Sequence, residues 1–401
     1  MNGKKLWDSA DDNSWKFWMN DREAILGIVV ILLIIGSINI FSSSFVLSET
    51  YYDTPYFFLT KHGINVCVGI VFFVLGAYID YHYWRSWIVW IFLAVVIMLI
   101  LVLIIGTEVN GARRWLQLGV TVQPAEFAKM LAIFIEAAYI SSRVAIGGKC
   151  QLFHAQMGVL AFLFLLIERE PDGATAALVI GVPMCMLLLS NMPRQTKFIL
   201  LGCIAAAGVL ICIIQPYRLE RVLTMLDPWQ NATDSGYQIV QSLQAIGSGG
   251  FWGMGLGQGI SKYHYLPEAH TDFAFAIWCQ ENGFLGAFGV ILLFGAFTYY
   301  GTRIATSAKD AYGQILAAGI ICLLVGQAAA NMLMVGGWFP VVGVPLPFIS
   351  YGGSSLAVCM GAVGILFNIG SKNAPPKTLV TSAPPAEEES AYRRPRLKRI
   401  K

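Results

Sequence analysis

The chain has 401 residues, of which 56% are hydrophobic and only 13% are charged, and its formal net charge at pH 7 is +3. Soluble globular proteins carry about a quarter charged residues, so this composition excludes a soluble globular protein or a string of soluble domains. Apolar runs of about the length that crosses a bilayer recur from end to end. The sequence therefore predicts an all-α polytopic membrane protein.

The apolar runs predict ten membrane spans. They are 24–47, 62–80, 86–105, 123–142, 154–168, 173–190, 197–214, 271–300, 312–336 and 348–370. The first run is longer than the ~7–15-residue core of a cleavable signal peptide, so we expect a retained signal anchor. A polar tail (1–23) precedes the membrane domain (24–370), a large loop (215–271) joins spans seven and eight, and a basic tail (371–401) has a disordered composition.

The basic residues predict how the spans are oriented. If both termini face the cytoplasm, 19 of the 27 Lys and Arg residues lie on the cytoplasmic side or at its boundary, which is the asymmetry of the positive-inside rule. A wrong span count would scramble this asymmetry. We therefore expect cytoplasmic termini and an extracytoplasmic 215–271 loop.

Asp272 is the strongest candidate for a catalytic residue. It lies where the longest polar loop enters span eight, and ionisable groups at membrane depth are costly and usually functional. Burial there can raise the pKa of a carboxyl toward the value that suits a general base. The alternative is that Asp272 caps the N-terminus of span eight.

Other polar residues that could bind a substrate lie in the predicted outer segments or at span depth. They are Arg113, Arg114, Trp115, Glu126, Lys129, Arg218, Arg221, Lys262, His270 and Ser350. Glu126 and Lys129 are spaced i, i+3 and can instead form a structural ion pair, and Trp115 can be an interfacial tryptophan. The proline- and glycine-rich stretch 339–355 predicts re-entrant backbone, which is tolerated only inside protein or along a cavity.

The eight cysteines point to packing rather than to chemistry. Seven lie in apolar segments and no pair has metal-site spacing, so we expect neither a disulfide framework nor a zinc site. His264, His270 and the nearby carboxylates form no recognisable metal motif. No cofactor is identified, and a divalent cation stays open.

Several segments resemble the signature blocks of the SEDS family (FtsW, RodA, SpoVE), which are bacterial cell-wall glycosyltransferases. These blocks are Asn110–Trp115, Gln123–Lys129, Glu170–Asp172, Asp227–Trp229, Gln241–Gly250, Pro267–Phe273 and Pro345–Ser355. They cover nearly the whole membrane region in order. Pro267–Phe273 is more similar to the division member FtsW, whereas Pro340–Pro345 is somewhat more similar to RodA. Where many relatives have Gly-Glu-Glu, this chain has Cys279-Gln280-Glu281.

The resemblance implies polymerisation of lipid II into glycan strands at the outer leaflet. It places the family's essential aspartate at Asp272 and a conserved outer-loop tryptophan at Trp115. An acceptor hydroxyl would attack the anomeric carbon of a glycan on undecaprenyl pyrophosphate, with inversion. One base and a cationic clamp on the leaving pyrophosphate suffice, unlike the paired carboxylates of glycosidases. The basic residues named above are the clamp candidates.

The resemblance also implies partners and a location. A class B penicillin-binding protein would supply the crosslinks, other division proteins would join it, and the site would be the bacterial cytoplasmic membrane, at the septum; nucleic acid is not expected. Three alternatives stay open: a lipid II flippase, a scaffold that recruits a partner, and the elongation polymerase of the RodA type. No two-half repeat, which many transporters show, is apparent in the chain.

Overall fold

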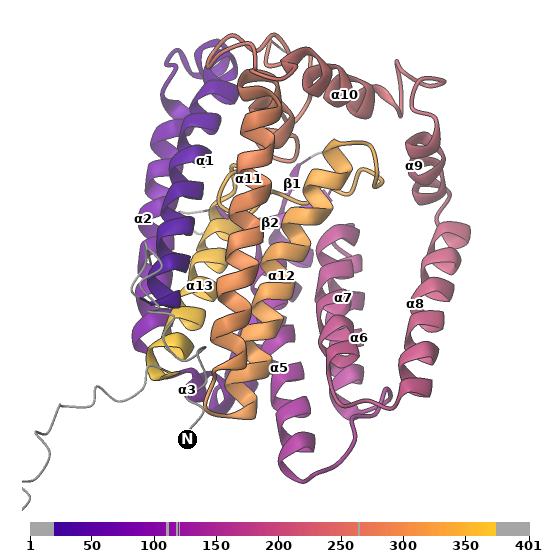
Figure 1. Cartoon of the computed structure of the whole chain (residues 1–401). Coiled ribbons are helices and arrows are strands. Elements are labelled where there is room, and N and C mark those ends of the chain that lie inside the picture. The colour runs from indigo at the N-terminus through magenta and orange to yellow at the C-terminus, as the bar shows by residue number, and fades with distance from the viewer. Residues whose placement is uncertain (1–19, 110–111, 118, 120, 264, 374–401) are drawn as a thin grey trace, which may run out of the picture.

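The computed structural model describes residues 20–109, 112–117, 119, 121–263 and 265–373. The helices form one bundle, with a small sheet and long loops toward one end of it (Figure 1). They are α1 (Asp21–Tyr52), α2 (Phe57–Tyr78), α3 (Tyr81–Ser86), α4 (Ile88–Ile105), α5 (Pro124–Ala145), α6 (Ala155–Glu168), α7 (Gly173–Leu189), α8 (Arg194–Ile214), α9 (Pro216–Leu226), α10 (Tyr237–Gly249), α11 (Ala274–Thr306), α12 (Ala311–Val335) and α13 (Gly353–Asn373). Most of both predicted tails, 1–19 and 374–401, lies outside the described residues.

Every predicted span overlaps one helix, and the polytopic helical architecture is confirmed. Among the described residues, seven helices are long and apolar enough to cross a membrane, namely α1, α2, α4, α8, α11, α12 and α13. The apolar helices α6 and α7 are shorter, at 14 and 17 residues. α5 has 22 residues but includes charged side chains such as Glu126, Lys129 and Glu136.

Local sequence signals set several helix ends. Pro124 stands in the first turn of α5, where its fixed φ suits a helix and its missing N–H is not needed. The Asp172 carboxylate accepts a hydrogen bond from the Thr175 N–H at the start of α7. Asp310 does the same for Gly313 at the start of α12. Each cap satisfies a backbone donor that has no partner within its helix.

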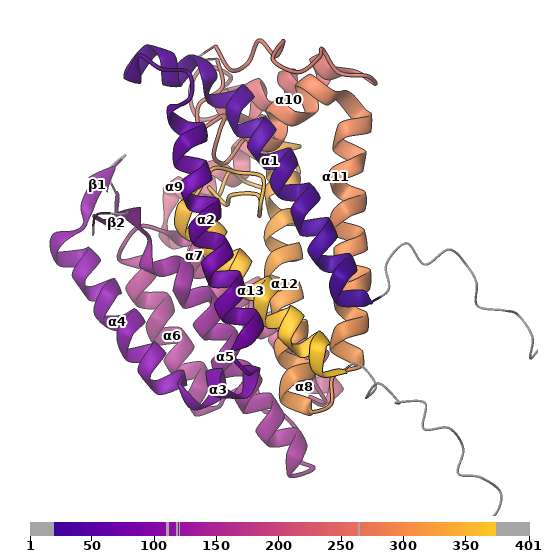
Figure 2. The same cartoon turned by 90° about the vertical axis from the view of Figure 1, so that its left-hand side faces the viewer.

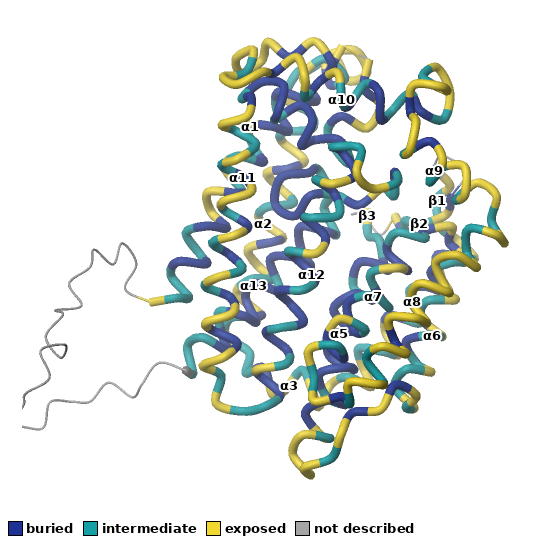
Figure 3. The backbone as a smooth tube through the Cα atoms, turned by 45° about the vertical axis from the view of Figure 1, so that its right-hand side comes forward, coloured by how far each residue is buried: buried dark blue, intermediate teal, exposed yellow. Residues whose placement is uncertain are grey.

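Burial divides the bundle into a core and an edge. In the most apolar stretch of each helix, 72% of α13 and 56% of α12 is buried, compared with 6% of α8. α13 lies against α2, where a Cβ on Gly76 would stand 2.6 Å from the Gly361 carbonyl oxygen, so the glycine allows the two backbones to approach. Within α8 only Leu200 is buried, and the helix stands at the edge of the bundle (Figure 3).

The prediction of an all-α fold was wrong for the segment between α4 and α5. Three short antiparallel strands, β1 (Thr107–Val109), β2 (Ala112–Gln117) and β3 (Thr121–Val122), form a sheet in the order β1-β2-β3. Glu108 pairs with Arg113. The sheet stands beyond the end of α4 (Figure 2). This segment is too polar to continue α4, and pairing its strands satisfies the backbone groups that a helix would otherwise bond internally.

The large loop between α8 and α11 is folded. It contains α9 and α10, and the stretch after α10 forms backbone hydrogen bonds with a kink in α11 at Gly283, whose φ of 63° suits glycine. The Met254 N–H donates to the Gln280 carbonyl at 3.0 Å. Lys262 is buried and forms an ion pair with Glu281 at 3.0 Å. This packing fixes the loop over the end of the bundle.

A non-helical stretch, 336–352, lies between α12 and α13, as predicted for re-entrant backbone. Two amides one turn apart on α12 hold it in place. Gln327 donates to the Pro345 carbonyl at 2.9 Å, and Asn331 donates to the carbonyls of Val344 and Asp272, both at 2.7 Å. These bonds supply donors to buried carbonyls that have no helical partner.

We expect Asn331→Ala to lower the apparent unfolding temperature of the purified protein in detergent. The change leaves two carbonyls without this donor, and each unsatisfied buried group costs about 1–3 kcal/mol. Asn191→Ala is the matched control, because its amide donates to the Gly148 carbonyl at an exposed position, where water can replace it. Equal, small shifts for both variants would show that Asn331 does not hold this backbone.

Candidate active site

Asp272 lies in the last turn before α11, at the end of the bundle that carries the loops. Phe273 is the N-cap residue and makes no side-chain capping bond, so the alternative that Asp272 caps the helix is wrong. The Asp272 backbone is held from two sides. Its carbonyl accepts from Asn331, and the next residue's N–H donates to the Glu268 carbonyl at 3.1 Å. The carboxylate is therefore presented from a fixed backbone.

The carboxylate of Asp272 faces the backbone of the re-entrant segment. A Cβ on Gly343 would lie 3.2 Å from the Asp272 Oδ2. Gly343 also has a φ of 55°, a left-handed conformation that side chains rarely adopt. Glycine at this position leaves open space beside the carboxylate.

The charges around Asp272 come from four separate segments. The pKa of Asp272 is raised to about 7: burial raises it most, the negative charges of Glu268 and Asp172 also raise it, and the positive charges of Arg114 and Arg221 lower it. These residues lie before α11, at the start of α7, in β2 and in α9. Four segments that are far apart in the sequence therefore place charged groups around one carboxylate. A carboxyl with this pKa exchanges protons near neutral pH.

Two guanidinium groups, those of Arg114 and Arg221, lie close enough to lower the pKa of this carboxyl. Arg114 donates to the carbonyls of Glu170 and Pro171, and Arg221 donates to the Val341 carbonyl. Burial and the Arg114 charge lower the pKa of Arg221, whereas the Asp272 charge raises it. Two like charges in a half-buried setting repel each other. An anion placed between them would relieve this repulsion.

Glu170 and Asp172 are functional candidates that were absent from the predicted site residues. Glu170 is fully buried, and its carboxyl oxygens have no hydrogen-bond partner among the described residues. Burial and then the Asp172 charge raise the pKa of Glu170 to about 8, against the Arg114 charge. Asp172 accepts from the Gln123 side chain at 2.9 Å. The acidic Glu170-Pro171-Asp172 stretch was the available signal, and its loop position concealed its burial.

Four predicted residues engage other parts of the fold. Arg113 pairs with Glu108 at 3.4 Å on the exposed side of the sheet. Arg218 forms an ion pair with Glu168. Lys262 pairs with Glu281, as described above. Trp115 is half-buried in β2, where its carbonyl accepts from Thr107.

The remaining predicted residues contact the helices and the re-entrant segment around the site. Glu126 and Lys129 form a buried ion pair at 2.8 Å, as the alternative reading of their spacing predicted, and Lys129 also donates to Gln327 at 2.9 Å. The His270 ring lies 4.8 Å from the Phe58 ring and its carbonyl accepts from the Tyr351 N–H. The Ser350 hydroxyl accepts from the Leu346 N–H at 2.9 Å, which closes a turn in the re-entrant segment.

Comparison with known proteins gives matches along almost the whole chain. The family model described as "Cell cycle protein", which covers FtsW, RodA and SpoVE, matches residues 22–374. The chain is 38% identical over 349 residues to the stage V sporulation protein E of Bacillus subtilis, covering 85% of this chain and 94% of that protein. It is 39% identical over 362 residues to a probable peptidoglycan glycosyltransferase FtsW of Trichlorobacter lovleyi, covering 88% and 94%.

Two solved structures share the fold. One is a chain of a peptidoglycan synthase complex that coordinates polymerization and crosslinking, with a TM-score of 0.71 and 24% identity over 90% of this chain and all of that one. The other is the rod shape determining protein RodA of Thermus thermophilus, with a TM-score of 0.63 and 22% identity over 88% of this chain and 97% of that one. At these identities the likeness concerns the fold alone.

We expect Asp272→Asn to stabilise the folded protein, and more at pH 8 than at pH 5. The folded-state pKa of about 7 lies above the unfolded value, so the folded state binds the extra proton and loses stability as the pH rises toward 7. Asparagine removes this loss. Unfolding midpoints of wild type and variant in the same detergent at both pH values provide the measurement, with the exposed Asp234→Asn as control. A pH-independent difference would contradict the raised pKa.

Proposed function

This chain belongs to the SEDS family of FtsW, RodA and SpoVE proteins, and on that basis we propose that it is a peptidoglycan glycosyltransferase that polymerises lipid II. The observation that carries the proposal is that Arg114 and Arg221 both lie near Asp272, whose pKa is raised to about 7. A transferase that displaces a pyrophosphate needs one base and a cationic site for the leaving group. The arrangement around Asp272 provides both groups.

The proposed reaction is a single displacement with inversion. The Asp272 carboxylate removes the proton from a sugar hydroxyl of lipid II. The hydroxyl oxygen forms the new bond to the anomeric carbon of the growing glycan, and the bond from that carbon to undecaprenyl pyrophosphate breaks. The pyrophosphate leaves with the electron pair, and the proton stays on Asp272 until water takes it. No general acid is required, because a pyrophosphate is a stable leaving group.

Arg114 and Arg221 are the residues that would hold the pyrophosphate. Guanidinium groups bind phosphate oxygens through paired N–H donors. The charges of Arg114 and Arg221 both lower the pKa of Asp272, so both groups lie near the proposed base. Among the described residues, no group of three or more His, Cys, Asp or Glu side chains could hold a metal ion. The steps above use side chains of this chain, and a divalent cation at the pyrophosphate stays open.

The site would face the outside of the cytoplasmic membrane in a ten-span arrangement. α5, α6 and α7 would complete the spans alongside the seven longer apolar helices. The charge asymmetry of the sequence supports cytoplasmic termini, and α1 runs from its start toward the end of the bundle that carries the loops (Figure 1). Only Leu200 of α8 is buried, so little protein separates this helix from lipid. We infer that two lipid-linked substrates reach α9 and Arg221 from the membrane on this side.

We further propose a class B penicillin-binding protein as the transpeptidase partner and the division septum as the place of action. The likeness to a chain of a peptidoglycan synthase complex supports such a partner. The FtsW relatives support a role in division, and the sporulation relative supports a related role in building new wall. Other division membrane proteins would join the same assembly.

We expect Asp272→Asn to abolish polymer formation from lipid II by the purified protein with its transpeptidase partner. Loss of a general base lowers a rate by about 10²–10⁴, while lipid II binding persists because the shape of the side chain is kept. Glycan products on gels and binding of labelled lipid II are the two measurements. Glu220→Gln, which changes an exposed carboxylate of α9, is the control. Polymer at the wild-type rate would exclude Asp272 as the base.

The pH dependence of polymerisation should report the charges around Asp272. The base must be ionised, so the rate rises with pH through about 7. Glu268→Gln removes a negative charge that raises this pKa, so the rising limb should move to lower pH. Arg221→Gln removes a positive charge that lowers the pKa, so the limb should move to higher pH. Rates measured across pH 5–9 test both directions, and shifts of the same sign would refute the assignment.

A further inference from the structure

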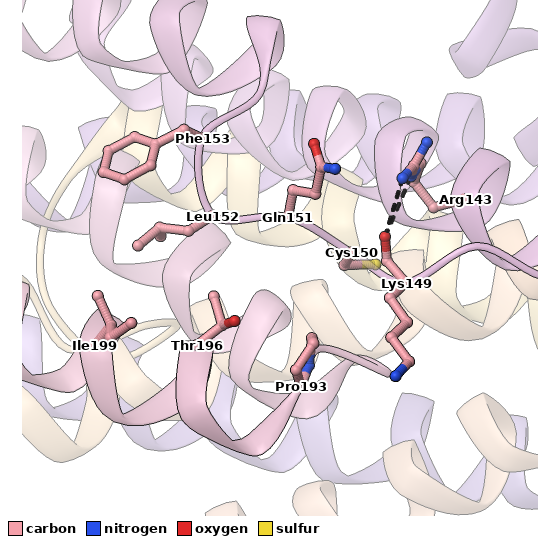
Figure 4. Close-up of a pocket in the computed structure, with 9 residues that line it drawn as sticks. All are labelled: Arg143, Lys149, Cys150, Gln151, Leu152, Phe153, Pro193, Thr196 and Ile199. Atoms are coloured by element: carbon pink, nitrogen blue, oxygen red, sulfur yellow. Dashed lines mark hydrogen bonds between the residues drawn. The ribbon is translucent and has the colours of Figure 1, made fainter.

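A cavity lies at the end of the bundle opposite Asp272, between the end of α5, the start of α8 and the loop that follows α5. Its volume is about 690 Å³. Figure 4 shows the lining residues, and the catalytic scheme uses none of them. They are Arg143, Lys149, Cys150, Gln151, Leu152, Phe153, Pro193, Thr196 and Ile199.

The loop that forms one wall of this cavity is fixed by bonds to its neighbours. The Tyr139 hydroxyl accepts from the Gln151 N–H at 2.9 Å. The Arg143 guanidinium donates to the Lys149 carbonyl at 3.2 and 3.3 Å. Asn191 donates to the Gly148 carbonyl at 3.0 Å. The wall is therefore preorganised, and a ligand would not have to order it.

One side of the cavity is cationic. The ammonium group of Lys149 is exposed and its side chain extends toward Pro193 in Figure 4. Pro193, the N-cap of α8, and Thr196 both line the cavity, so the first turn of this 21-residue helix borders the same space. Free helix N–H groups together with a basic side chain bind phosphate oxygens well.

The other side of the cavity is apolar and open. Phe153 is 81% exposed and Ile199 is 56% exposed, and both belong to the cavity lining. A free phosphate would make no use of this surface. A molecule with a phosphate at one end and a hydrocarbon chain at the other would contact both sides.

We propose that this cavity binds an anionic phospholipid of the leaflet on this face. The phosphate lies between Lys149 and the N-terminus of α8, and an acyl chain runs along Phe153 and Ile199. The charge distribution predicts that this face is cytoplasmic, where anionic lipids concentrate. Only Leu200 of α8 is buried within the protein, so the bound lipid would supply an additional contact that holds the N-terminal end of this helix.

The test uses full-length protein that has been stripped of lipid in detergent, with bound lipid counted by native mass spectrometry. Phosphatidylglycerol is offered against phosphatidylcholine with the same acyl chains, and glycerol phosphate is offered as the soluble competitor. Wild type should retain phosphatidylglycerol preferentially, and glycerol phosphate at equal concentration should not displace it. Lys149→Gln should weaken this retention about fivefold, the effect expected for one basic residue near anionic lipid.

Two further variants make the test specific. Lys309→Gln removes an exposed lysine between α11 and α12 that does not line the cavity, and retention should match wild type. Phe153→Ser keeps every charge and should still reduce retention, because it removes apolar contact; it also tests the site if Lys149→Gln cannot be purified. Equal retention of the two lipids, displacement by glycerol phosphate, or equal effects of Lys149→Gln and Lys309→Gln would overturn the proposal.

Discussion

The site depends on how α12 accommodates backbone that is not helical. Inside a membrane protein, each buried carbonyl outside a helix needs a donor from elsewhere in the chain. Gln327 and Asn331 supply donors to the re-entrant segment, and Asn331 also holds the Asp272 carbonyl. Asn331 therefore holds both the re-entrant backbone and the backbone that presents the reactive carboxylate. Fold and site share one set of hydrogen bonds.

A second constraint is electrostatic. Burial makes ionised Asp272 unfavourable, and Arg114 and Arg221 compensate only in part, because they also repel each other. Such a site is less stable than an apolar core would be, and it is ready to bind an anion between its two cations. Stability given up at an active site in this way is a common trade-off in enzymes. A costly buried carboxylate beside two cations is an arrangement that a glycosyltransferase with a pyrophosphate leaving group can use.

Much of this arrangement could be predicted from the sequence. The apolar runs located the helices, and the proline- and glycine-rich composition of 339–355 indicated the non-helical stretch before α13. Hydropathy gives no signal for the sheet, although Asn110-Gly111 is a dipeptide typical of a hairpin turn. The pairing of Lys262 with Glu281 could not be predicted, because the two residues are joined only by the packing of the loop onto α11. Asn331 resembled an ordinary polar residue of a span until its two acceptors were known.

Gly343 has a consequence for inhibition. A side chain at this position would meet the Asp272 carboxylate and would also have to adopt a strained backbone. The chain therefore has few tolerated substitutions on the surface that faces its reactive group. A compound that contacts the Gly343 backbone would rest on a surface that mutation cannot easily reshape, so resistance arising at that contact would cost the protein its own chemistry.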